Sequence, residues 1–214
     1  MTATPLVARA LDVGFTQLAR RGLRGVWVRG TFPDVPFIWT ANHHSWWDAF
    51  VARAVLQDID RPASLLMEAD NLATYGFLRQ VGVIPTVHVR AALRSVREGS
   101  TLIIFPEGEL RTAGPLGTLA PGAGWLAAHA PAPLVPIAVR IVLRAQQYPE
   151  AYVDVAAPTD SNGLTAALAA ALQALDADLI HCAAATPIPG FRRVLRGRRS
   201  WDERLVSWLS TLSR

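Results

Sequence analysis

The sequence predicts a single α/β domain with a mixed, partly parallel central sheet flanked by helices. The 214-residue chain is 51% hydrophobic and 18% charged, which is enough apolar material for one core and argues against disorder. Short apolar runs alternate with helical stretches, as in chains that build parallel sheets. Several runs are almost continuously apolar, which is typical of strands covered on both faces. No repeat or linker marks a second domain, so we assign residues 1–214 to one domain.

The elements follow in order from these patterns. A first helix is expected over about residues 5–22, because Val7, Leu11, Phe15 and Leu18 recur at helical spacing. Strands are predicted at residues 26–30, 36–42, 64–69, 83–89, 101–105, 134–141 and 151–157. Helices are predicted at residues 45–56, 71–81, 90–98, 122–129 and 164–184.

A Pro/Gly cluster at residues 186–190 sets off a basic tail, which we expect to form a helix over about residues 191–214. All 21 basic residues are arginines, and five of them lie within residues 192–199. Without those five the formal net charge would be −1 instead of +4, so the basicity is local. Such a patch suits anionic lipid headgroups or nucleic acid, and a solvated tail is the plainer interpretation.

The tail helix is expected to begin at a capping box formed by residues 200–203. Its apolar stripe consists of Trp201, Leu205, Trp208, Leu209 and Leu212. A stripe of this kind packs on the body of a protein or lies in a membrane interface, and the sequence leaves both alternatives open.

The expected location is cytoplasmic and peripheral, on the inner face of the cell membrane. Cys182 is the single cysteine, and the N-terminal residues lack the apolar core of a signal peptide. No run reaches the ~18 to 20 apolar residues that span a bilayer.

Residues 41–48, "ANHHSWWD", combine two histidines with an acid directly after an apolar run. Residues 45–48 also match a capping box, so Asp48 is either a capping acid or a partner that orients a histidine. In the second case His43 takes a proton from an alcohol, and His44, four residues before Asp48, competes for that role. No histidine or cysteine elsewhere has a paired spacing, so no metal site is expected.

A second segment, residues 103–114 or "IIFPEGELRTAG", contains the end of a predicted strand and the loop after it. In this loop, Gly108 permits close backbone approach to a ligand, and the guanidinium group of Arg111 offers a fork for phosphate. Taken alone it is a plain strand-to-loop exit. Read together, Asn-His-x-x-x-x-Asp and Phe-Pro-Glu-Gly some sixty residues later resemble the lysophospholipid acyltransferase family, of the glycerol-phosphate acyltransferase type, over residues 37–139.

The resemblance implies a glycerolipid acyltransferase-like fold and assigns catalysis to His43 and Asp48, in preference to His44. It links acceptor binding to Phe105, Pro106, Glu107 and Gly108. Residues 82–90 resemble the family's second block, with Arg90 as a contact to the acceptor phosphate, and Arg111 is a further contact. Residues 134–139 resemble the fourth block. Glu109 and Leu110 stand where the family often has Thr-Arg, and an acid there repels a phosphate.

The function implied is that of an O-acyltransferase of phospholipid biosynthesis and lipid metabolism. It moves a fatty acyl group from acyl-CoA or acyl carrier protein, as co-substrate, to a hydroxyl of a lysophospholipid, glycerolipid or related lipid. No cofactor and no nucleic acid is expected, and the partners are the acyl donor, the lipid acceptor and a membrane surface. The alternatives are a non-catalytic basic lipid- or nucleic-acid-binding protein on the same fold, and an acyl-thioester hydrolase.

Overall fold

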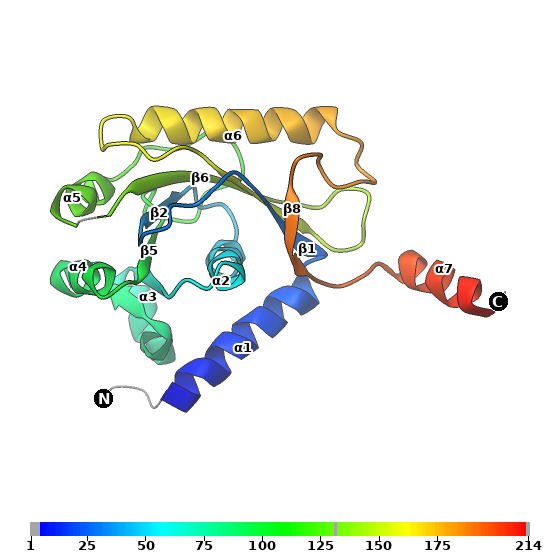
Figure 1. The fold of residues 1–214 in the computed structure, drawn as a ribbon, viewed down its shortest axis with the longest axis horizontal. Coiled ribbons are helices and arrows are strands. Elements are labelled where there is room, and N and C mark those ends of the chain that lie inside the picture. Colours follow the sequence, from blue (N-terminus) through cyan, green and yellow to red (C-terminus); the bar gives the residue numbers. More distant parts are fainter. Residues whose placement is uncertain (1–4, 131, 213–214) are drawn as a thin grey trace.

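An eight-stranded sheet crosses the molecule in the order β4-β3-β5-β2-β6-β7-β1-β8 (Figure 1). The computed structural model describes residues 5–130 and 132–212. The strands are β1 (Gly25–Arg29), β2 (Ile38–Ala41), β3 (Ala63–Met67), β4 (Val83–Pro85), β5 (Thr101–Ile104), β6 (Leu134–Val142), β7 (Glu150–Val155) and β8 (Arg192–Arg196). The five strands from β4 to β6 pair in parallel, whereas β6 with β7 and β1 with β8 are antiparallel. The predicted mixed, partly parallel sheet is confirmed.

Helices cover both faces of this sheet (Figure 1). They are α1 (Pro5–Gly22), α2 (Asp48–Asp58), α3 (Ala69–Thr74), the 3₁₀ helix η1 (Gly76–Val81), α4 (Val89–Arg97), α5 (Gly122–His129), α6 (Leu164–His181) and α7 (Trp201–Leu212). Successive strand residues point to opposite faces: Ile38 packs in the core under α4 and α5, and Trp39 in the core under α1 and α2. This alternation explains why the central strands are apolar almost throughout.

Helix α6 is long and apolar enough to cross a membrane when judged by length and composition alone. Its leucines at positions 164, 168, 172 and 175 are buried, and those at 164, 172 and 175 belong to the hydrophobic cores beneath it. Its two acids, Asp176 and Asp178, pair with Arg140 and Arg29 of the sheet. In this structure α6 is therefore a covering helix of the domain (Figure 1).

The expectation of a helix over residues 191–214 is wrong for its first part. Residues Arg192–Arg196 form β8, which pairs with β1 at the edge of the sheet, and α7 begins only at Trp201. The physical reason is that β1 would otherwise leave a row of backbone N–H and C=O groups unpaired. Leu195 is buried and the arginines of β8 are exposed, as suits an edge strand. Residues 213–214 lie outside the described part of the chain.

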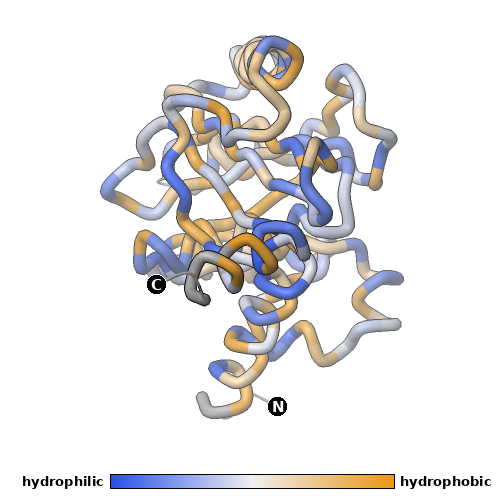
Figure 2. Tube along the Cα trace, turned by 90° about the vertical axis from the view of Figure 1, so that its right-hand side faces the viewer, coloured by the Kyte–Doolittle hydropathy of each residue, from blue (hydrophilic) through white to orange (hydrophobic). Residues whose placement is uncertain are grey.

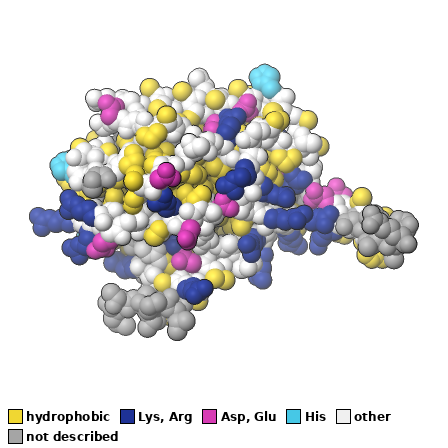
Figure 3. Space-filling view, in the orientation of Figure 1, with side chains coloured by type: hydrophobic (Ala, Val, Ile, Leu, Met, Phe, Trp, Pro, Cys, Tyr) yellow, Lys and Arg dark blue, Asp and Glu magenta, His cyan; other side chains and the backbone are white. Residues whose placement is uncertain are grey.

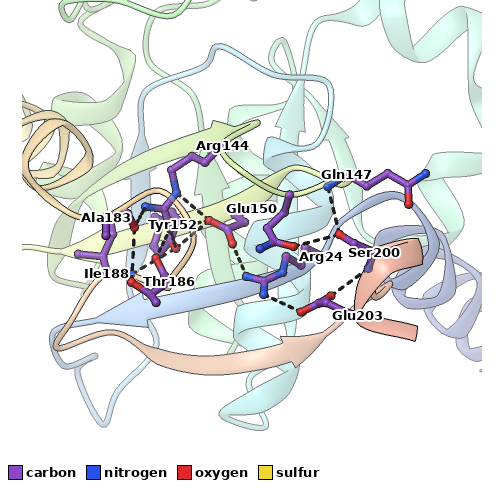
Figure 4. A network of polar contacts seen from close by, with 11 residues as sticks. Arg24, Arg144, Gln147, Glu150, Tyr152, Ala183, Thr186, Ile188, Ser200 and Glu203 are labelled. Atoms are coloured by element: carbon purple, nitrogen blue, oxygen red, sulfur yellow. Dashed lines mark hydrogen bonds and ion pairs between the residues drawn. The ribbon is translucent and has the colours of Figure 1, made fainter. Parts of the chain in front are cut away.

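A buried polar network joins the start of α7 to the sheet (Figure 4). Glu150, at the start of β7, is fully buried and accepts hydrogen bonds from Arg24 (2.5 Å), Arg144 (2.8 Å) and Tyr152 (3.0 Å). Burial and the nearby Glu150 carboxylate raise the pKa of Tyr152 to about 12. Arg24 also donates to Glu203 of α7 at 2.9 Å. The Glu150 carboxylate thus balances the charges of two largely buried arginines. Through Arg24 and Glu203 it also fixes the first turn of α7.

We expect Glu150→Gln to lower the free energy of unfolding by about 3 to 5 kcal/mol, because it leaves two buried guanidinium groups without their shared counter-charge. Urea unfolding measures the change. The matched control is Asp58→Asn, which removes the acid from an ion pair with the exposed Arg192 and should change stability by less than about 1 kcal/mol. Equal losses in the two variants would contradict this account of the network.

Candidate active site

The Asp48 carboxylate organises the turn between β2 and α2. Its Oδ2 accepts three hydrogen bonds of 2.8 Å, from His43 Nδ1 and from the backbone N–H groups of His44 and Ser45. The Asp48 side chain is fully buried, whereas that of His43 is 24% exposed. Ser45 does not cap α2, which begins at Asp48 itself with Trp47 as its N-cap residue. Asp48 therefore turns back onto the preceding turn and fixes the imidazole of His43.

This arrangement sets which ring nitrogen of His43 carries the proton. A buried carboxylate accepts a hydrogen bond, so Nδ1 is the protonated nitrogen. Nε2 keeps its lone pair and has no hydrogen-bond partner within the part of the chain that the structure describes. Phe105 stacks on the imidazole at a centroid distance of 4.3 Å. The ring is thus held on one edge by Asp48 and on one face by Phe105.

His44 lies in a different environment from His43. Its side chain is 5% exposed, and its Nε2 accepts a hydrogen bond from the backbone N–H of Ile141 at 3.1 Å. Burial lowers the pKa of His44, the charge of Arg140 adds to this effect and that of Asp48 opposes it. Because Nε2 is already occupied, His44 is not placed to accept a proton from a bound molecule.

Glu107 connects the loop after β5 to the His43 turn. Its buried carboxylate accepts the backbone N–H of His43 through Oε2 and that of Gly117 through Oε1, both at 2.8 Å. The backbone N–H of Arg111 donates in turn to the His43 carbonyl at 2.9 Å. Gly108 sits between these contacts with a φ of +75°, a left-handed conformation that favours glycine. The two segments singled out in the sequence are therefore joined by reciprocal hydrogen bonds.

Arg111 and Arg140 line one small cavity together with His43, His44 and Glu107. Arg111 is partly exposed and pairs with Glu109 at 2.8 Å. Thus the acid that departs from the family pattern neutralises the neighbouring arginine.

Arg140 was missed in the sequence. It is buried, pairs with Asp176 through two hydrogen bonds of 2.6 and 2.8 Å, and donates to the Gly114 carbonyl at 2.6 Å. It was detectable as the single charge in a strand otherwise buried on both faces, where an arginine needs a partner.

The remaining predicted site residues divide into two groups. Pro106 is buried next to Phe105 in the chain, and its carbonyl accepts the backbone N–H of Ala120 at 2.7 Å, which places it within the same loop. Arg90 is not brought to this cavity: it lies in the first turn of α4 and lines a separate groove with Trp125. Within residues 5–130 and 132–212, no cluster of three or more histidine, cysteine or acidic side chains has the arrangement of a metal site.

His44 makes a testable contribution to stability as a function of pH. Because its folded-state pKa lies below the ordinary value of 6.5, the unfolded chain binds its proton first as the pH falls. The stability contributed by neutral His44 is therefore complete above about pH 6.5 and is lost as the pH drops toward the folded-state pKa. We expect urea unfolding to show a weaker loss of stability below that pH in His44→Gln than in the wild type. His181→Gln, at an exposed position, is the control; identical pH profiles for the wild type and His44→Gln would contradict the expectation.

Comparisons with known proteins identify the family and the fold. The sequence model of the acyltransferase family matches residues 25–140, which is more than half of the chain. No curated protein sequence gives a significant match. The fold is similar to the crystal structure of the 1-acyl-sn-glycerophosphate (LPA) acyltransferase PlsC from Thermotoga maritima. That match has a TM-score of 0.54 and 17% sequence identity, and it covers 79% of this chain and 75% of the other. The matched family segment contains His43, Asp48 and the whole Phe-Pro-Glu-Gly loop, and the chain belongs to the acyltransferase family.

Proposed function

We propose that the enzyme transfers a fatty acyl group from acyl-CoA or acyl carrier protein to a hydroxyl of a lysophospholipid, glycerolipid or related lipid, with His43 as general base. The observation that carries the proposal is the hydrogen bond of 2.8 Å between His43 Nδ1 and the fully buried Asp48 carboxylate. It leaves Nε2 as an unoccupied base on a side chain that is open to solvent on one side. A carboxylate that fixes the tautomer of a histidine also stabilises the imidazolium that forms when the histidine accepts a proton.

In the proposed reaction, Nε2 of His43 removes the proton of the acceptor hydroxyl as its oxygen attacks the thioester carbonyl carbon. The carbonyl oxygen becomes an oxyanion in a tetrahedral intermediate. The intermediate collapses by breaking the carbon–sulfur bond, and the departing thiolate takes the proton from the imidazolium. The products are an ester and a free thiol, and His43 returns to its starting form.

The acceptor site is proposed between His43 and the loop that holds Phe105, Glu107, Gly108 and Arg111. Glu107 supports this site through backbone hydrogen bonds to His43 and Gly117, so its role is to hold the loop against the histidine. Arg111 faces the same cavity, but Glu109 already shares its charge. This pairing favours an acceptor that carries one negative charge or none near its hydroxyl, since a phosphate monoester would have to displace Glu109. The position of Arg90 gives no support to its expected contact with an acceptor phosphate.

We also propose that the enzyme works in the cytoplasm, peripherally on the inner face of the cell membrane, through α7 and the arginines before it. Helix α7 projects from the body of the domain (Figure 1), and Trp201, Val206 and Trp208 are between 59% and 66% exposed. From the side on which α7 projects, apolar and polar residues alternate along both α7 and α1 (Figure 2). Arginine side chains gather at the base of α7 (Figure 3). Exposed tryptophans beside arginines are typical of helices that lie in the interface of an anionic membrane.

The catalytic proposal predicts that purified protein forms labelled esters from labelled acyl-CoA and at least one member of a panel of lysolipids and glycolipids. His43→Ala should lower kcat/KM by about 10²- to 10⁴-fold, the usual contribution of a general base. Asp48→Asn should lower kcat in the same range, because the imidazolium loses its buried counter-charge. His181→Ala, on the exposed end of α6, should keep wild-type activity, and circular dichroism should show that each variant is folded.

Two outcomes would contradict the catalytic proposal. Full activity in His43→Ala would remove the base from the mechanism. Absence of transfer from wild-type enzyme to every acceptor would leave the binding-protein alternative, and release of free fatty acid without any acceptor would indicate a thioester hydrolase.

The membrane proposal predicts that Trp201→Ser/Trp208→Ser weakens partitioning onto phosphatidylglycerol-containing vesicles at least about tenfold, since each large apolar side chain contributes roughly 1.5 to 3 kcal/mol when buried. Vesicle sedimentation measures the partition coefficient, and added salt should weaken the binding of the wild type because screening reduces the contribution of the arginines. Leu143→Ser/Ile180→Ser removes two apolar side chains outside α7 that are more exposed than the two tryptophans, and serves as the control. Unchanged partitioning of the tryptophan variant would refute the role of α7.

A further inference from the structure

A second concave surface lies outside the His43 cavity, in a groove beside α4 and α5. It has a volume of about 540 Å³ and is lined by residues 87–91, Arg94 and Trp125. Val87 is 70% exposed and Trp125 is 46% exposed, so apolar side chains face solvent here although they contact no substrate in the mechanism above. The proposed acyl-acceptor site therefore does not explain why this groove has an exposed apolar lining.

The basic side of the groove is a stripe of arginines on α4. Arg90, Arg94 and Arg97 follow one another at spacings of four and three residues, which places them on one face of the helix. The opposite face buries Ala92 and Val96 against the sheet. The guanidinium groups of Arg90 and Arg94 make no ion pair or hydrogen bond within residues 5–130 and 132–212, and Arg97 contacts only the His129 carbonyl.

Arg90 and Arg94 therefore differ from the arginines that hold the fold together, whose charges are balanced by acids. Those of the sheet and its flanking helices, such as Arg24, Arg29, Arg140 and Arg144, each pair with a carboxylate. In Figure 3 basic side chains gather at the left-hand edge, where α4 lies in Figure 1. Unpaired guanidinium groups lining a groove favour a ligand with several negative charges, and their forked donors match phosphate oxygens.

Trp125 supplies a second kind of contact. It projects from α5 into the lining of the groove, with His129 stacked on its ring at a centroid distance of 4.0 Å. An indole that is supported in this way and still half exposed offers a flat apolar surface for a planar ring. Phosphate-binding arginines and a stacking surface together are the recognition features of a nucleotide.

The groove also lies at the same edge of the sheet as His43. Helix α4 follows β4, and His43 follows β2, so both start where parallel strands end. Three strand spacings of about 4.8 Å separate β4 from β2, or about 14 Å in all. The pantetheine arm of coenzyme A has a backbone about as long as four residues, which spans roughly 14 Å when extended.

We propose that this groove binds the nucleotide end of coenzyme A, with its phosphates on Arg90 and Arg94 and its adenine against Trp125. The inference rests on the proposed function and names its donor as acyl-CoA. The pantetheine arm crosses the edge of the sheet and delivers the thioester to His43. The groove takes no part in the chemical step, so it contributes to the KM for the donor and not to kcat.

The test compares wild type with Arg90→Glu/Arg94→Glu, using acyl-CoA and acyl-pantetheine, which lacks the nucleotide, as donors. The KM for acyl-CoA should rise at least about tenfold, because two charge-assisted contacts become repulsive, while kcat stays within about twofold. Kinetics with acyl-pantetheine should be unchanged. Arg90→Lys/Arg94→Lys should restore most of the affinity, and Trp125→Ala should raise the KM for acyl-CoA alone. Arg20→Glu/Arg21→Glu, which reverses two exposed arginines of α1, is the charge-matched control.

Calorimetric titration with 3′-phosphoadenosine 5′-diphosphate tests the groove independently of acyl transfer. The proposal requires binding by the wild type and at least about tenfold weaker binding by Arg90→Glu/Arg94→Glu. Unchanged nucleotide affinity together with an unchanged KM would overturn it. A rise in KM confined to acyl carrier protein as donor would also overturn it and assign the arginine stripe to an acidic carrier protein. If the wild type transfers no acyl group from any donor, the proposed function fails, while the titration still decides whether the groove binds a nucleotide.

Discussion

The site depends on one buried carboxylate. Asp48 lies where β2 ends and α2 begins, and the same oxygen accepts the His43 ring and the backbone N–H groups of His44 and Ser45. Burying a carboxylate is costly, and these three donors on Oδ2 offset part of that cost. Asp48 therefore does not act as part of a regular capping box: as the first residue of α2, it holds the backbone of the preceding turn and orients the His43 imidazole at the same time. A carboxylate placed one residue earlier or later in the sequence would lose its hydrogen bonds to the turn backbone and to the His43 imidazole together.

The second constraint is the loop that follows β5. Phe105 stacks on His43, while Glu107 and Arg111 exchange hydrogen bonds with the His43 backbone. Arg140 then ties the far part of the loop, at Gly114, to β6 and to Asp176 of α6. The cavity wall is thus held by contacts to three separate elements. This explains how residues more than sixty positions apart keep one geometry, and why Glu107 acts on the site through backbone groups.

The fold was largely predictable because burial on both faces leaves a strong apolar signal, as in residues 101–104 and 134–139. The pairing of His43 with Asp48 was predictable as an alternative, and resemblance to a family was needed to choose it. Strand β8 was not predictable, because the local sequence "RRVLR" resembles a solvated run. It forms a strand only because it pairs with the edge of β1 in the folded protein. The ties made by Arg140 were also missed, because they depend on where Asp176 and Gly114 lie in space. Local sequence patterns thus indicate secondary-structure elements and motifs. The edge strand of the sheet and the hydrogen bonds that support the site depend on tertiary contacts.

The sequence gives only the net charge of the arginines and acids, whereas the structure shows which arginines are paired with acids and which are not. Those facing the sheet and the site are paired with acids and hold elements together, as Arg24 and Arg144 do through Glu150. The charge of these arginines is already balanced, at least in part, within the protein. Arg90 and Arg94, which have no acidic partner in the part of the chain that the structure describes, lie beside a groove near the edge of the sheet that carries His43. Further exposed arginines lie before α7, on the other side of the molecule in Figure 1. The proposed reaction joins a polyanionic donor to a lipid acceptor, and two separate basic surfaces fit the proposal that donor and membrane are bound at the same time.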